Sequence, residues 1–198
     1  MNLEGARNYP IVQRIGGVEV TLRKMTPKDR AAMLAFARSL PEHDLLFLRR
    51  DITQESEVDA WIRDIEQGHI ETVLAESAGK LAGYATVHRN ELHWSNHVAE
   101  LRVTVSESMR GQGLGRVLTQ EAFALALAAG IEKMIAQMTL DQKGAIAVFE
   151  GLGFRPEALL RDQVKDRAGT KHDLLVLSHE VATFERTLTA YGVADVFK

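Results

Sequence analysis

The sequence predicts an α/β fold, in which a central, mixed, mostly antiparallel sheet is flanked by helices in a single domain. Two observations predict it. Segments that alternate apolar and polar residues, as strands do, are interleaved with segments whose apolar residues recur at helical spacing. No internal repeat, low-complexity tract or linker interrupts the 198 residues, so nothing divides them into separate domains.

The first half of the chain is expected to supply a strand, two helices and a hairpin of two further strands. Thr26 and Pro27 are typical of the cap and the first position of a helix, and Gly68 is typical of a helix end. Residues 78–80 read Ala-Gly-Lys and predict the tight turn of the hairpin. These elements are expected at residues 16–25, 27–40, 56–68, 69–77 and 81–89.

The second half is expected to contain a crossover unit. A strand at residues 97–105, a helix at 114–129 and a mostly apolar strand at 133–140 form this unit, so the two strands should be parallel and buried. A short helix, a closing hairpin and an extra C-terminal helix follow, and that last helix either extends the core or pairs with a second subunit. We therefore expect an N-terminal extension, one folded domain and a C-terminal helical extension at residues 1–15, 16–181 and 182–198.

Composition excludes several classes of function. Hydrophobic residues make up 45% of the chain, which is enough for an ordinary globular core. The net charge of −3 and the lack of a basic stripe argue against a nucleic-acid partner and against an anionic membrane surface. The chain has no cysteine, so it cannot use a thiolate nucleophile or a thiolate metal site. We expect a cytoplasmic protein, because no signal peptide or membrane span is evident.

A glycine cluster stands at the start of the predicted helix 114–129. Residues 109–130 read MRGQGLGRVLTQEAFALALAAG, with three glycines at alternate positions between two arginines. Free amides at a helix N-terminus bind anions such as phosphate, and glycine lets a ligand approach the backbone closely. Neither the P-loop pattern nor the dinucleotide-binding pattern fits the glycine spacing. The alternative is a glycine turn that only packs a helix on a sheet.

The cluster resembles the acyl-CoA loop of the GNAT superfamily of N-acyltransferases, whose pattern is Arg/Gln-x-x-Gly-x-Gly/Ala. The match runs through Arg110-Gly111-Gln112-Gly113-Leu114-Gly115. Val105 stands five residues upstream, where the family usually has a valine, and AIAVFEGLGF at 145–154 resembles the second signature of the family. By order of elements the resemblance covers residues 16–181. The layout is also similar to bacterial protein-lysine acetyltransferases, including the charged segment near Arg49.

The resemblance implies a set of cofactor contacts. The backbone of Val103 and Val105 would pair with the pantetheine arm of acetyl-CoA, and the Val105 N–H would donate to the oxyanion. Gln142 and Phe149 stand in the second signature, where family members often have asparagine and tyrosine. Phe149 cannot donate a proton to the leaving thiolate. The loop residues that would hold the pyrophosphate are Arg110, Gly111, Gln112, Gly113, Leu114, Gly115 and Arg116.

Glu100 is the candidate general base. Strand alternation places Glu100, Arg102 and Thr104 on one face of a strand that should be central, and a polar face there indicates a solvent-accessible cleft. Glu100 also resembles the carboxylate that some family members place on this strand. The alternative is an ion pair between Glu100 and Arg102 without a catalytic part. Tyr84 is either a substitute proton donor or a core residue.

These observations predict an N-acetyltransferase that moves an acetyl group from acetyl-CoA to a primary amine in a ternary complex. Acetyl-CoA is the co-substrate, and no metal is expected, since the spacing of His88, His93 and His97 matches no ligand pattern. The acceptor, a protein lysine or a small-molecule amine, stays open. The segment 44–52 either lines the acceptor site or is an ordinary helix with a basic edge. The alternative function is a non-catalytic acyl-CoA-binding regulatory module. Whether the protein forms a homodimer stays open.

Overall fold

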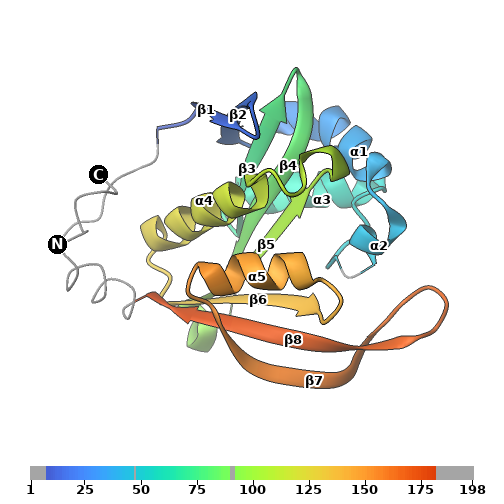
Figure 1. The fold of residues 1–198 in the computed structure, drawn as a ribbon. Coiled ribbons are helices and arrows are strands. Elements are labelled where there is room, and N and C mark those ends of the chain that lie inside the picture. Colours follow the sequence, from blue (N-terminus) through green and yellow to red (C-terminus); the bar gives the residue numbers. More distant parts are fainter. Residues whose placement is uncertain (1–7, 47, 90–91, 182–198) are drawn as a thin grey trace.

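The computed structural model describes residues 8–46, 48–89 and 92–181. Eight strands in these residues form one sheet in the order β1-β2-β3-β4-β5-β6-β8-β7 (Figure 1). The strands span Ile11–Ile15 (β1), Val18–Lys24 (β2), Ile70–Ser77 (β3), Lys80–Arg89 (β4), Val98–Val105 (β5), Lys133–Thr139 (β6), Arg155–Lys165 (β7) and Lys171–Glu180 (β8).

Helices cover both faces of the sheet. In the described residues they are Arg30–Ser39 (α1), Glu42–Leu45 (α2), Glu55–Glu66 (α3), Leu114–Ala128 (α4) and Lys143–Gly151 (α5), with short 3-10 turns at Pro27–Asp29 (η1), His93–Ser95 (η2) and Glu107–Met109 (η3). Figure 1 shows α4 lying across one face of the sheet, with α1 and α3 behind it. None of the helices in this described part is long and apolar enough to cross a membrane.

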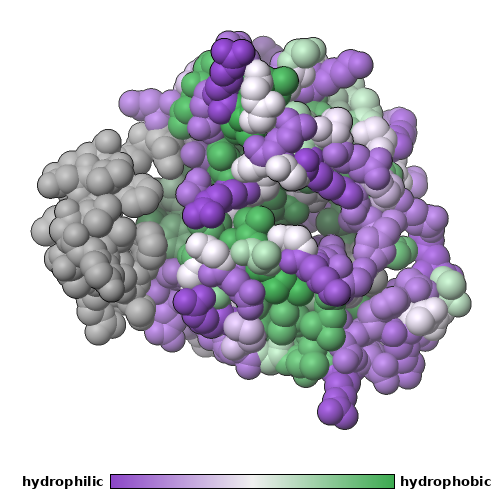
Figure 2. Space-filling view, in the orientation of Figure 1, coloured by the Kyte–Doolittle hydropathy of each residue, from purple (hydrophilic) through white to green (hydrophobic). Residues whose placement is uncertain are grey.

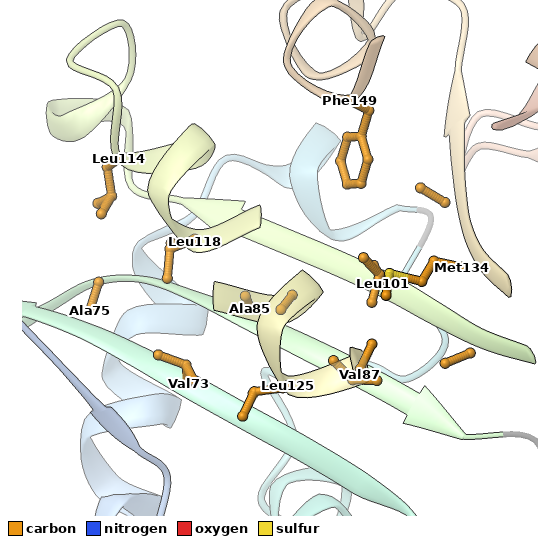
Figure 3. Packing of buried hydrophobic residues seen from close by; sticks show 14 of the residues in the cluster. Val73, Ala75, Ala85, Val87, Leu101, Leu114, Leu118, Leu125, Met134 and Phe149 are labelled. Carbon is orange, nitrogen blue, oxygen red and sulfur yellow. The ribbon is translucent and has the colours of Figure 1, made fainter. Parts of the chain in front are cut away.

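The apolar face of α4 builds the larger half of the core. Leu114 and Leu118 are fully buried, and Leu125 is 5% exposed. In Figure 3 these side chains project from α4 toward strand residues such as Val73 and Ala85. This helix therefore holds β3, β4 and β5 together and places the loop before it at the end of β5.

Aromatic residues pack the opposite face of the sheet against α1 and α3. Tyr84 lies edge-on to Trp61, with ring centroids 5.0 Å apart, and edge-on to Phe36 at 6.0 Å. The indole nitrogen of Trp61 donates a hydrogen bond to Thr72 Oγ1 at 3.0 Å. Each buried aromatic group thus has either an apolar contact or a hydrogen-bond partner.

The mixed sheet direction predicted from the sequence is confirmed. Every neighbouring pair of strands is antiparallel except β5 and β6, which are parallel and joined by the α4 crossover. The β5–β6 pairing is short, because its register ends at Glu100 opposite Ile135. Beyond that point no further pairing joins the two strands, so among the residues that the structure describes one backbone edge of β5 has no strand partner.

The sheet begins before residue 16. The sequence predicts an N-terminal extension at residues 1–15, whereas Ile11–Ile15 form β1 and pair with β2. A two-residue turn at Gly16 and Gly17, with φ angles of 58° and 85°, joins the strands. The Tyr9 hydroxyl also donates to Glu121 Oε2 on α4 at 2.8 Å. The predicted C-terminal helix, residues 182–198, lies outside the described residues.

The last hairpin forms the far edge of the sheet. Strand β7 is exposed along almost its whole length, including Leu159 and Leu160. Figure 2 shows a mostly hydrophilic surface on this face of the molecule, with hydrophobic surface gathered around α5 and the strands beside it. The candidate site lies where β5 and β6 separate, between the C-terminal strands and the part of the sheet that packs against α1 and α3.

Candidate active site

The glycine loop between β5 and α4 adopts backbone conformations that favour glycine. Gly111 and Gly113 have φ angles of 70° and 94°, in the left-handed region that other residues rarely adopt. A Cβ atom built at either position would have no other atom within 4 Å. The two glycines therefore form the turn, and the backbone on that side stays open to a ligand.

The first turn of α4 presents free amides beside this loop. Gly113 is its N-cap and provides no side-chain hydrogen bond. The first intrahelical bond runs from the Val117 N–H to the Gly113 carbonyl at 3.2 Å, so the amides before Val117 have no partner in the helix. Leu114 is fully buried and anchors the turn, whereas Arg116 is exposed. Free amides, the positive helix end and Arg116 together favour an anion.

The side chains of Gln112 and Arg110 both contact neighbouring parts of the chain. Gln112 Nε2 donates to the Ser108 carbonyl at 2.7 Å, and its side chain fills the space where Gly16 lacks a Cβ atom. Arg110 Nε donates to the Val105 carbonyl at 3.3 Å. The Arg110 guanidinium also forms an ion pair with Asp44 on α2.

The end of β5 turns backbone groups that do not pair with β4 toward the gap between β5 and β6. The Ser106 N–H bonds to the Ala82 carbonyl at 2.8 Å, which makes that pair hydrogen-bonded. Because hydrogen-bonded and non-hydrogen-bonded pairs alternate in an antiparallel ladder, Val103 and Val105 direct their N–H groups away from β4. This edge of β5 is the one that β6 has left, so an extended ligand can pair with it.

Glu100 lies in an ion-pair network on the face of β5 opposite α4. Its Oε1 is 2.6 Å from Arg102 Nη2, and its Oε2 is 3.4 Å from Arg49 Nη1. The ion pair of the alternative interpretation is therefore present, together with a second arginine that the sequence placed in segment 44–52. Glu100 is 11% exposed, so the polar face of this strand is largely buried rather than an open, solvent-filled surface.

The two residues of the second signature are engaged within the protein. Gln142 is the N-cap residue of α5, and its Oε1 accepts a hydrogen bond from the Thr139 N–H at 3.1 Å. Phe149 is 5% exposed and packs edge-on against Phe154, with ring centroids 5.0 Å apart. In Figure 3 its ring points from α5 toward the sheet. Both side chains thus position the β6–α5 segment beside the end of β5.

Tyr84 and His88 occupy the same face as Glu100, on the neighbouring strand β4. Burial raises the pKa of the Tyr84 hydroxyl, whose partner is Thr104. Its aromatic contacts and burial agree with the core interpretation. His88 stands directly opposite Glu100 in the register. In the described residues, no group of three or more histidine, aspartate or glutamate side chains is arranged to hold a metal ion.

The order β5, glycine loop, α4, β6, α5 and the separation of β5 from β6 are features of one enzyme family. The family model of the acetyltransferase (GNAT) family matches residues 37–154. This chain belongs to that family, as the resemblance of its glycine loop predicted.

Individual proteins are similar to this chain in part of the sequence or in fold. The chain is 31% identical over 87 residues to "Putative phosphinothricin acetyltransferase YwnH" of Bacillus subtilis (strain 168), a match that covers 44% of this chain and about half of that protein (53%). An acetyltransferase of the GNAT family from Streptococcus pneumoniae has the same fold, with a TM-score of 0.72 at 21% identity, over 82% of this chain and 99% of that one. The structure of yncA from Salmonella typhimurium, solved with its cofactor acetyl-CoA, gives a TM-score of 0.71 at 22% identity, over 82% and 94%.

One contact of the site was not predicted from the sequence, although its first residue stands in the segment 44–52. Asp44 reaches Arg110 although 66 residues separate them in the chain. The segment 42–44 reads Glu-His-Asp, and its charges carry no local sign of their partners. Only the fold brings α2 beside the glycine loop.

Proposed function

We propose that this protein transfers the acetyl group of acetyl-CoA to a primary amine, by direct transfer in a ternary complex. The observation that carries the proposal is the backbone of β5 beyond Glu100, left by β6 and adjacent to the uncapped N-terminus of α4. Acetyl-CoA, when bound, supplies the acetyl group as an activated thioester. Composition supports the direct route, since the chain has no cysteine that could carry the acetyl group as a thioester.

The residues present fit such a co-substrate. The open side of Gly111 and Gly113, the free amides up to Arg116 and the Arg110 side chain suit a pyrophosphate. The outward backbone groups of Val103 and Val105 suit the amide groups of a pantetheine arm. These contacts are proposals that rest on the loop and strand geometry.

Two groups of the protein would act on the reacting atoms. The Val105 N–H faces the gap beside the loop, where it can donate to the carbonyl oxygen as negative charge develops. Glu100 lies on the same strand and can accept a proton from the acceptor ammonium, directly or through water. The buried Phe149 provides no proton for the leaving thiolate, which is acidic enough to leave without one.

A panel of amines identifies the class of the acceptor. The name of YwnH makes phosphinothricin one compound to include, beside a lysine peptide, spermidine and free amino acids. A second candidate function is a regulatory module that binds acetyl-CoA without transferring the acetyl group. It is favoured by the buried Phe149, because phenylalanine cannot donate a proton to the leaving thiolate.

Calorimetry followed by a transfer assay tests the proposal. Acetyl-CoA should bind to one site, and Arg110→Glu should abolish binding. Glu100→Gln should keep binding but slow transfer about 100-fold or more, consistent with loss of a general base. Glu71→Gln, which removes a carboxylate from β3, is the matched control. Binding without transfer to any amine would favour the regulatory module, and absence of binding would refute both.

A further inference from the structure

Glu100 is held by two arginines that differ in exposure. Arg102 lies 2.6 Å from one carboxylate oxygen, and its side chain is 18% exposed. Arg49 lies 3.4 Å from the other oxygen, and its side chain is 56% exposed. The inner arginine is therefore a fixed part of the sheet, whereas the outer one covers the free side of the carboxylate and can be replaced from solvent.

The surroundings of this outer ion pair carry an excess of positive charge. Arg50, next to Arg49 in the chain, pairs with Asp64 at 2.6 Å. Within the described part of the chain, its Nη1 is buried and has no hydrogen-bond partner. Among the described residues, three guanidinium groups thus lie near the two carboxylates of Glu100 and Asp64.

His88 is neutral and adds no further positive charge to that of the arginines. Burial, followed by three nearby arginine side chains, lowers the pKa of the His88 imidazole to about 3, so it is neutral at physiological pH. The three arginines are Arg102, Arg49 and Arg50. They therefore lie near the face of β4 and β5 on which His88 stands opposite Glu100.

We propose that the acceptor carries a carboxylate next to its amine, as a free amino acid does, and that it replaces the Arg49–Glu100 ion pair at both ends. The acceptor ammonium takes the place of the Arg49 guanidinium on Glu100. Its carboxylate takes the place of Glu100 on Arg49. This inference rests on the proposed function, since it assigns the acceptor of that reaction.

The exchange is favourable for a zwitterion and unfavourable for a polycation. A half-exposed ion pair at 3.4 Å contributes little stability, so it opens readily. A zwitterion leaves both Glu100 and Arg49 paired. Spermidine or an aminoglycoside pairs only with Glu100, leaves Arg49 without a counter-ion and adds cations beside Arg50 and Arg102. The acceptor therefore uncovers the proposed base only if it carries the anion that Arg49 binds.

The experiment compares each of several amino acids with its own amide, at saturating acetyl-CoA and with the full chain. The amide lacks the carboxylate, and its amine loses a proton more readily, so intrinsic reactivity favours the amide. We expect wild-type protein to prefer the acid at least tenfold in kcat/KM. Arg49→Gln should remove this preference, mainly through a higher KM for the acid, and leave the amide rate equal or higher. Arg63→Gln, at an exposed arginine on α3, is the matched control.

Other outcomes separate this inference from the proposed function. Equal rates on acids and amides, or faster transfer to spermidine or to a lysine within a peptide, would overturn the inference and leave the proposed function standing. Equal loss of acid and amide rates in Arg49→Gln, with acetyl-CoA affinity and melting temperature unchanged, would overturn it as well. Absence of transfer to every amine would refute the proposed function itself.

Discussion

Asp44 on α2 forms an ion pair with Arg110, the first residue of the glycine loop. The two neighbours of Asp44 also pair with distant parts of the chain. Glu42 binds Arg167 in the β7–β8 hairpin at 2.9 Å, and His43 lies 2.9 Å from Asp141 in the β6–α5 turn. The short helix α2 thus connects the N-terminal half of the sheet to the loop and to the C-terminal half.

The Asp44–Arg110 pair should oppose cofactor binding. A pyrophosphate on the loop competes with the Asp44 carboxylate for the same guanidinium and is repelled by it. Asp44→Asn should therefore tighten acetyl-CoA binding about two- to fivefold, or roughly 0.5–1 kcal/mol, as expected for a partly exposed pair. Calorimetric titration measures it, and Glu42→Gln, which breaks only the Arg167 pair, should leave affinity unchanged. Weaker binding by Asp44→Asn would show that Asp44 instead holds Arg110 in its binding orientation.

The turn at Gly113 should tolerate no other residue without a loss of stability. At a φ of 94° an alanine is strained even though its Cβ atom would meet nothing, so Gly113→Ala should destabilise the protein by about 1–3 kcal/mol and weaken acetyl-CoA binding. Gly144 in α5 has ordinary helical geometry and equally open space, so Gly144→Ala should stabilise by up to about 1 kcal/mol. Thermal unfolding of both variants checks the contrast, and similar melting temperatures would contradict it.

Most of the fold could be predicted because periodicity reports local structure. The apolar stripe of α4 and the alternation in β5 predicted both elements and their parallel crossover, and the sheet confirms it. Strand β1 was missed, although Gly16-Gly17 between alternating residues is a hairpin signal. Five residues form a weak pattern by themselves, and only pairing with β2 stabilises them.

The site could be predicted in part, since its backbone elements are local in sequence whereas its ion pairs are not. The glycine turn and the face that carries Glu100 and Arg102 follow from motif and alternation. The partnership of Arg49 with Glu100 depends on the fold, which brings Arg49 beside β5 although 51 residues separate the two in the chain. No pattern along the chain encodes that contact, so the electrostatics of the site required the structure.

Restoring the tyrosine of the second signature should not restore a proton donor. Phe149 is enclosed by apolar residues such as Phe154, so a hydroxyl there would lose its water without gaining a partner. Phe149→Tyr should destabilise by about 1–3 kcal/mol and leave kcat unchanged. Denaturant unfolding and a transfer assay measure the two effects, with Phe123→Tyr, at a partly buried position on α4, as the comparison. A higher kcat with a new alkaline limb in the pH profile would contradict the prediction.

The depressed pKa of His88 should make stability fall with acidity. The unfolded imidazole takes up a proton near pH 6.5, whereas the folded one does so only near pH 3, because of burial and the three arginines around it. Below pH 6.5 the unfolded state binds one more proton at His88 than the folded state does. The contribution of His88 to the free energy of unfolding therefore decreases by about 1.4 kcal/mol per pH unit until pH 3. Between pH 7 and pH 5 wild-type protein should lose roughly 2 kcal/mol more than His88→Asn, measured by urea unfolding. His179, whose pKa burial also lowers, titrates in both proteins and cancels in the difference. Parallel pH curves would show that His88 accepts its proton in the folded state as readily as in the unfolded one.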